Sequence, residues 1–226
     1  MNFPKHGLFL GLLVALAAAL PSAANDSVKH VAGPADNYVF ELAAPGTYRL
    51  PVVKTAADGT VLDQNGTRHD LHDLLTGHIT FLAFVYTRCG DICPLATMRL
   101  AQLRDLAGSN ERHTRRLITM SFDPEHDTPQ RMADFAESWL DAGGQKQIPW
   151  LFLTARSRAA VEPLLAGYDQ PLPPRKDGND AFRPVRHLMR VFLIDQQARI
   201  RNIYSPDFLD PRLMLNDLLT LEASAD

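Results

Sequence analysis

The stretch Ile79-Thr-Phe-Leu-Ala-Phe-Val-Tyr86 decides the fold class of this 226-residue chain. It is an almost unbroken run of apolar, β-branched and aromatic residues, which is typical of a strand covered on both faces. Such a strand belongs at the centre of a sheet with helices on either side. We therefore predict that residues 79–86 form the central strand of an α/β sheet.

Alternating strand and helix patterns follow this central run. Helices are expected from Pro94 to Gly108, through Met132 to Leu140 with an end at Gly143-Gly144, over 159–165 and from Pro211 to about Leu221. Strands are expected over 117–122, 150–153, 189–194 and 200–204, the last two forming a hairpin. This order predicts a three-layer α/β fold that binds ligands at the carboxyl ends of its parallel strands.

The segments outside this alternation are predicted from turn signals. Residues 52–62 are read as extended chain, Asn65-Gly66 as a turn, and 71–75 as a short helix. One strand is expected around residues 38–42, and the segment from Gln170 to Pro184, rich in Pro, Gly and Asp, is expected to be a long exposed loop.

The N-terminus has the pattern of an export signal. Lys5 precedes an apolar run from Gly7 to Leu20 and the small residues of Pro21-Ser-Ala-Ala24. The run is shorter than the roughly 20 apolar residues that a membrane span requires, so an uncleaved anchor is the weaker alternative. We predict a signal peptide over residues 1–24, an N-terminal extension over 25–48, one domain over 49–226, and a periplasmic mature chain that does not span a membrane.

The charge pattern narrows the class of partner. The formal net charge is −3, and loss of Lys5, the only Lys, Arg, Asp or Glu in residues 1–24, makes it −4. Acidic and basic residues are mixed along the chain rather than gathered in blocks. Nothing in this pattern favours nucleic acid or an anionic membrane surface as a partner.

Cys89 and Cys93 are the only two cysteines of the chain, and they lie four residues apart. A disulfide stabilises mainly by closing a long loop, so this pair adds little to stability. The pair lies where the central strand passes into the next helix, and the start of a helix stabilises a thiolate. If the first turn is helical, both sulfurs lie on one face and can bind one ion or each other.

The metals that suit such a pair follow from the chemistry of sulfur. Thiolates are soft ligands for Cu(I) and zinc, and an added imidazole also accepts Cu(II). A structural zinc site is disfavoured because the sequence has no second C-x-x-C and no paired histidines nearby. For the C-x-x-x-C spacing taken alone, a chance spacing or a simple disulfide remains the alternative.

Three stretches occur in the order of the signature blocks of one family. They are Phe84-Val-Tyr-Thr-Arg-Cys-Gly-Asp-Ile-Cys-Pro94, Ser121-Phe-Asp-Pro-Glu-His-Asp-Thr-Pro129, and His187 followed by Phe192-Leu-Ile-Asp195. With them the chain resembles the Sco/SenC family from about Tyr48 to Leu221. The cysteine block with its following proline is the most specific part.

This resemblance implies a thioredoxin-like fold with an N-terminal extension, and copper, as Cu(I) or Cu(II), bound by Cys89, Cys93 and His187. It also implies that the protein delivers copper to, or matures, the CuA centre of cytochrome c oxidase. The partners implied are a copper-accepting protein, such as an oxidase subunit, and a thioredoxin-like reductant. The residues themselves indicate the two cysteines independently. His187 rests on the family alone, since a lone histidine before an apolar strand is more often structural. The upstream histidines, His69, His72 and His78, are interpreted as solvated surface.

Several positions depart from the family pattern. Arg88 and Gly90 replace residues that are commonly His and Pro, and Arg186 stands where an acidic residue often precedes the family histidine. His126 stands where the family usually has a basic residue. In the same loop, Asp123 and Asp127 are expected to cap or brace the segment before the next helix rather than to bind metal.

Two functions fit these features best. The first is a copper metallochaperone that passes its copper to an exported protein, and the alternative is a thiol–disulfide reductase that acts on the cysteines of a copper-site protein. The cysteine pair would be the redox-active group in the second case. A peroxiredoxin-like peroxidase and a purely structural exported domain are weaker hypotheses.

Overall fold

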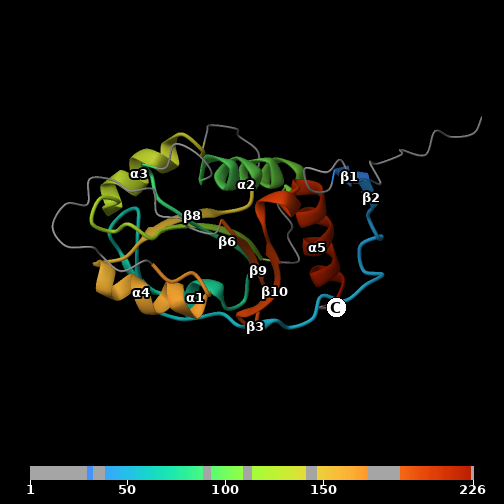
Figure 1. Ribbon diagram of the computed structural model, residues 1–226, viewed down its shortest axis with the longest axis horizontal. Helices are drawn as coiled ribbons and strands as arrows, with labels where there is room; N and C mark the ends of the chain where they lie inside the picture. The colour runs from blue at the N-terminus through green and yellow to red at the C-terminus, as the bar shows by residue number, and fades with distance from the viewer. Residues whose placement is uncertain are drawn as a thin grey trace, which may run out of the picture.

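The computed structural model describes residues 30–32, 39–88, 93–108, 114–140, 147–172 and 189–224, with the backbone alone at 30–32, at 39–41 and at Cys93. One large sheet has helices on both faces (Figure 1). The predicted three-layer α/β fold is confirmed.

The predicted central strand lies in the middle of the large sheet. Across the described sheet the strand order is β3 (Lys54–Thr55), β10 (Arg199–Tyr204), β9 (Val191–Ile194), β6 (Ile79–Val85), β7 (Arg115–Ser121), β8 (Trp150–Thr154), β4 (Thr60–Asp63) and β5 (Arg68–Asp70). Strands β6, β7 and β8 run parallel to one another, whereas β9 runs antiparallel to β6 and pairs with β10 as the predicted hairpin. We call the edge at which β6, β7 and β8 end the carboxyl edge, and the opposite one the amino edge.

Helices cover the two faces of the sheet in two groups. One face carries α1 (Leu71–Leu75) and α4 (Arg158–Gly167), and the other carries α2 (Cys93–Ala107), α3 (Pro129–Glu137) and α5 (Pro211–Ala223), with the short 3₁₀ helix η1 (Pro206–Phe208) before α5. Successive side chains of β6 point to opposite faces of the sheet and so enter two separate hydrophobic cores. Leu82 and Phe84 face α1 and α4, while Phe81 and Ala83 face α2 and α5. This alternation explains why residues 79–85 are apolar without a break.

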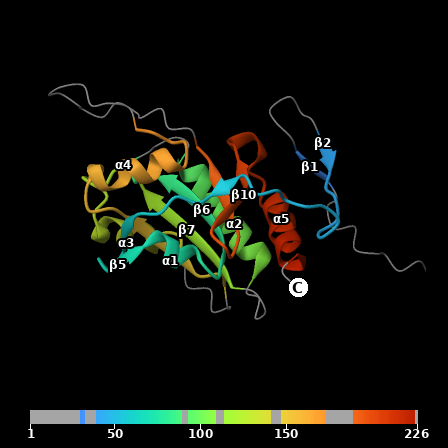
Figure 2. The ribbon, with the colours of Figure 1, turned by 90° about the horizontal axis from the view of Figure 1, so that it is seen from below.

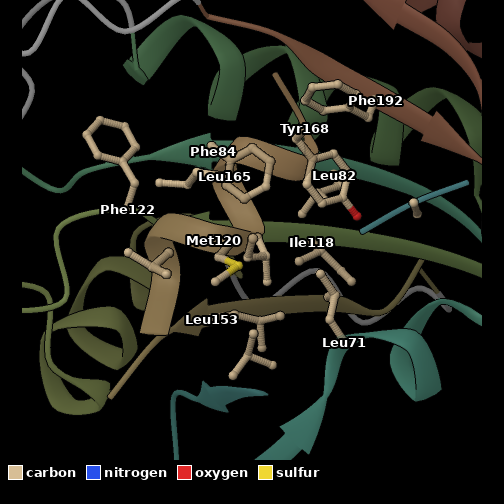
Figure 3. Close-up of a cluster of buried hydrophobic side chains, with 14 of the residues drawn as sticks. Leu71, Leu82, Phe84, Ile118, Met120, Phe122, Leu153, Leu165, Tyr168 and Phe192 are labelled. Atoms are coloured by element: carbon tan, nitrogen blue, oxygen red, sulfur yellow. The ribbon is translucent and has the colours of Figure 1, made fainter. Parts of the chain in front are cut away.

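The core under α1 and α4 is built around aromatic rings (Figure 3). The ring of Phe84 lies 5.1 Å from that of Tyr168 and 6.1 Å from that of Phe192, both in edge-to-face geometry. Tyr168 and Phe192 are themselves 5.0 Å apart. Such pairs contribute roughly 0.5–1.5 kcal/mol each beyond the burial of their area. They hold β6 and β9 against α4, and thus position the end of β6.

Three features differ from the sequence prediction. A strand, β5, follows the Asn65-Gly66 turn and pairs antiparallel with β4. Helix α4 begins at Arg158 and carries Pro163 in its interior, because its buried side chains Val161, Leu164 and Leu165 bind it to the core in spite of the backbone hydrogen bond that proline removes. Gln170, expected at the start of an exposed loop, is buried, and the loop beyond residue 172 lies outside the described residues.

The chain before the main sheet lies against α5. Strands β1 (His30–Ala32) and β2 (Val39–Glu41) form a separate antiparallel hairpin, which both views place beside α5 (Figure 2). Farther along, Tyr48 Oη donates to Asp217 on α5, as does Tyr204 Oη from β10, and the backbone N–H of Gly46 donates to Thr220. These contacts cross the predicted boundary at residue 48, which stays a prediction. Within the described ranges, every helix is too short or too polar to cross a membrane.

Candidate functional site

The three predicted copper ligands fall at the limits of the described chain. Cys89 and His187 lie outside the described residues, and Cys93 is the first residue of α2, of which only the backbone is described. The ligand set therefore stays a prediction, as does the shared face of the two cysteines. The described residues around them define the place where the site would form.

The strand register brings the relevant chain ends to the carboxyl edge. Strand β6 ends at Val85, four residues before Cys89. Val191, the first residue of β9, pairs with Ala83, so the chain enters β9 next to the point where it leaves β6. His187 precedes Val191 by four residues. The carboxyl edge of the sheet is thus where the cysteine segment departs and where the histidine segment arrives.

Asp127 anchors the chain just before the cysteine segment. Its carboxylate is completely buried and accepts hydrogen bonds from the N–H of Thr87 at 3.0 Å, from the hydroxyl of Thr87 and from the hydroxyl of Ser121. A buried carboxylate is stable only where its oxygens are satisfied in this way. Asp127 therefore ties Thr87, two residues before Cys89, to the end of β7.

Arg88, Asp123 and His126 form a second contact next to this anchor, which we call the Asp123 cluster. Arg88 Nη2 donates to Asp123 Oδ2 at 2.7 Å, His126 Nδ1 lies 3.0 Å from Asp123 Oδ1, and Arg88 Nη2 lies 2.8 Å from His126 Nδ1. Burial opposes the ionisation of Asp123, but hydrogen bonds from His126 and Arg88 outweigh burial and hold its pKa below the usual value. Asp123 is therefore an ionised carboxylate at neutral pH.

The expectation that Asp123 and Asp127 brace their loop is confirmed, while the cap of α3 belongs to Thr128. The hydroxyl of Thr128 accepts from the backbone N–H of Arg131 at 3.3 Å. The roles of Thr87 and Ser121 were missed by the sequence analysis. Their signal was a short hydroxyl residue at the end of β7 and another two residues beyond the end of β6, which became informative only once those strands were known to be neighbours.

The upstream histidines are separate from one another. His69 Nε2 lies 3.1 Å from Asp63 Oδ2 within the β4–β5 hairpin, and His72 is exposed. His78 is more engaged than a solvated residue, because its Nδ1 lies 2.9 Å from the carbonyl of Thr76 and its Nε2 lies 2.7 Å from Arg116. Among the residues whose side chains are described, no three of the types His, Cys, Asp and Glu are grouped so as to hold a metal ion.

Comparison with known proteins gives one consistent result. The family model described as SCO1/SenC matches residues 53–222. The SCO1 protein homolog of Bacillus subtilis is 25% identical over 146 residues, which cover 65% of this chain and 71% of the relative.

Two solved structures show the same fold. The crystal structure of Arabidopsis thaliana ScoI with copper bound is 20% identical, with a TM-score of 0.62 over 75% of this chain and 99% of that one. BsSco, described as a member of the Sco family of cytochrome c oxidase assembly proteins with a disulfide switch, is also 20% identical, with a TM-score of 0.60 over 80% of this chain and 100% of that one. At this level of identity the likeness shows the fold.

Proposed function

The chain belongs to the SCO1/SenC family, and we propose that it is a copper metallochaperone that carries copper on Cys89, Cys93 and His187. Copper is the cargo, which the protein passes by ligand exchange to an exported copper protein. The CuA centre of cytochrome c oxidase is the proposed destination.

The observation that carries this proposal is the pairing of Val191 with Ala83 at the carboxyl edge. Four residues of extended chain span at most about 14 Å, and adjacent strands lie about 5 Å apart. Cys89, four residues beyond β6, and His187, four residues before β9, are therefore within reach of each other and of Cys93. This geometry supports one site that draws ligands from two distant parts of the sequence.

The donor atoms suit copper in both oxidation states. Two thiolates favour Cu(I), and the imidazole extends the site to Cu(II). Helix α2 begins at Cys93 and has no acidic residue in its first turn, so the positive end of the helix dipole is available to a thiolate there. Metal binding requires the deprotonated thiolate, so the place of Cys93 at the start of α2 favours the form that binds copper.

The relatives support the destination. Structures of the same fold include one with copper bound and one from the Sco family of cytochrome c oxidase assembly proteins. Residues 1–24 read as an export signal, which would place the mature chain in the periplasm. A copper protein on that side of the membrane is the acceptor that fits both features.

Copper stoichiometry of the exported protein tests the proposal. The reduced protein, dialysed against copper, should retain one ion per molecule, and Cys89→Ala or Cys93→Ala should lose it. The Cu(II) form should show a thiolate charge-transfer band that collapses in His187→Ala. His69→Ala is the matched control, because His69 is paired with Asp63 on the β4–β5 hairpin and should leave the band unchanged. A reduced wild type that retains no copper shows the proposal to be wrong.

A thiol–disulfide reductase is the second candidate, and the start of α2 at Cys93 favours it. The two thiols of this chain would form a disulfide, while a target disulfide takes up two electrons and two protons. A Cys89→Ser or Cys93→Ser variant should then trap a mixed disulfide with the target. His187→Ala separates the two functions, since it should impair copper binding and spare disulfide exchange.

A further inference from the structure

We propose that two copies of this chain associate through the solvent-facing side of α2, with Arg99 of each copy opposite Asp105 of the other. We call this side the α2 face, and it consists of Met98, Arg99, Gln102, Asp105 and Leu106. Such association goes beyond the proposed function, because the α2 face holds no predicted copper ligand. The partner is a second copy of the same chain.

Two large apolar side chains of the α2 face are exposed to solvent. Met98 is 38% exposed and Leu106 is 54% exposed. They lie on the same side of the helix as Gln102, since residues four apart are neighbours along a helix. Leu100 and Leu103, by contrast, are fully buried in the core between α2 and the sheet. The helix therefore serves the core with one side and presents a second apolar pair, which the fold does not use, on the other.

A groove lies beside these side chains, where the start of α5 approaches α2 (Figure 1). Its volume is about 420 Å³. Its walls include Arg99, Gln102, Asp105 and Leu106 on α2 and Pro211 and Arg212 at the start of α5. The α2 face is thus hollowed along one side, and the groove can receive side chains of a second copy.

The charges of the α2 face complement those of a second copy. Arg99 donates to the neutral side chain of Gln102 at 3.0 Å, Asp105 is exposed, and in the described part of the chain neither charge belongs to a salt bridge. Arg212, on the other wall of the groove, is already paired with Asp210 at 2.7 Å. One cation and one anion are therefore available. This balance suits an identical face, whereas a strongly acidic or strongly basic partner would meet a like charge.

The residues of the α2 face are spaced symmetrically about Gln102. Arg99 and Asp105 lie three residues before and after it, and Met98 and Leu106 lie four residues before and after it. A two-fold axis that passes Gln102 in the plane between two copies of α2 can set Arg99 opposite Asp105 of the second copy, twice. The two helices then cross at nearly a right angle, and Met98 and Leu106 each lie beside the same residue of the second copy.

The contact between two such helices is small. Helices that cross steeply touch over few turns, so the buried area falls at the low end for specific interfaces, below about 1,200 Å². Exposed ion pairs contribute little to affinity, and burial of Met98 and Leu106 provides most of it. We therefore expect a reversible dimer that forms as the protein concentration rises.

Sedimentation velocity over a series of concentrations tests the proposal on the reduced, metal-free protein, in which neither a disulfide nor shared copper can join two copies. Wild type should show a monomer–dimer equilibrium. Arg99→Asp and Asp105→Arg should each weaken it by at least about tenfold, because like charges then face each other twice. An equimolar mixture of the two variants should associate like wild type, since both opposite-charge pairs are restored between them. Arg131→Asp, the same charge reversal at an exposed position of α3, is the matched control and should leave the equilibrium unchanged.

Three results would overturn the proposal. They are a wild type that stays monomeric up to about 1 mM, a dimer that both charge reversals leave intact, and a mixture of the two variants that stays monomeric. Thermal unfolding midpoints equal to wild type confirm that the variants are folded, as expected for exposed positions. Copper retention by the reduced protein is measured separately, so the metallochaperone proposal can fail or stand whatever the state of association.

Discussion

The charged side chains at the amino and carboxyl edges of the β6–β7 pair differ in burial and in their partners. At the amino edge, Arg115 forms a bidentate pair with Glu222 at 2.7 and 2.9 Å, each side chain is only 7% exposed, and the same guanidinium donates to the carbonyls of Ala107 and Gly108 at the end of α2. At the carboxyl edge, Arg88 is 39% exposed and shares Asp123 with His126.

This difference indicates a division of roles. The C-terminal end of α2 is closed by a buried ion pair in which each of the three guanidinium nitrogens of Arg115 donates to protein. The N-terminal end, at Cys93, lies where polar side chains remain accessible to solvent and to ligands. A buried pair fixes one arrangement, and an exposed cluster can exchange partners. We expect substitutions at the amino edge to change stability and those at the carboxyl edge to change copper binding.

Arg115→Ala should give the largest effect on folding. It removes the bidentate partner of the buried carboxylate of Glu222, so the free energy of unfolding should fall by about 3–5 kcal/mol. Urea denaturation followed by circular dichroism measures this change. Copper bound per folded molecule should stay at the wild-type value.

The double variant Arg115→Met, Glu222→Met is the control for this reading. If the loss in Arg115→Ala comes from the broken buried ion pair, replacing both of its partners with apolar side chains of similar size should restore most of the stability. A double variant that is less stable than Arg115→Ala would contradict this explanation.

Asp127→Ala should lower both stability and copper affinity, because Asp127 is buried and also anchors the chain next to the cysteine segment. The N–H and hydroxyl of Thr87 and the hydroxyl of Ser121 lose their acceptor, which costs about 1–3 kcal/mol of unfolding free energy. Since Thr87 precedes Cys89 by two residues, copper affinity should also fall by about 10–100-fold. A competition titration with a chelator measures the affinity.

The matched control is Asp134→Ala on α3, because Asp134 is exposed and accepts only from Gln130 in the described structure. Its stability should change by less than about 0.5 kcal/mol, and its copper affinity should stay the same. An unchanged copper affinity in Asp127→Ala would show that the anchor serves stability alone.

The sequence predicted those parts of the fold that depend on local patterns. The apolar run of β6, the hairpin of β9 and β10, and the helix α1 at Leu71–Leu75 are all confirmed, since each follows from residues that are neighbours in sequence. Contacts between distant residues were not predictable in this way. Arg115 and Glu222 are 107 positions apart, and Thr87 and Asp127 are 40 apart, so these pairs depend on strand order and register. The brace by Asp127 could be predicted, but its partners could not.

The smallest effect is expected at His78, a pH-sensitive contact of the amino edge. Burial first, and then the charge of Arg116, hold the pKa of His78 below its ordinary value, against the hydrogen bond to Thr76. The neutral ring, with hydrogen on Nδ1, donates to the carbonyl of Thr76 and accepts from Arg116. Protonation would place hydrogen on the nitrogen that faces the guanidinium.

The sign of the pH dependence follows from this shift. Below about pH 6.5 the unfolded chain binds a proton at His78 more readily than the folded chain does. The contribution of His78 to stability is therefore complete above about pH 6.5 and is lost as the pH falls from there through the lowered pKa of the folded chain. Urea denaturation between pH 5 and 8 on wild type and His78→Gln measures it, since glutamine keeps an acceptor for Arg116 but does not titrate. The variant should lose part of the dependence below pH 6.5, and its copper affinity should match wild type. A variant with the full wild-type dependence would assign the pH sensitivity to other groups, and a change in copper affinity would contradict the separation of the two edges.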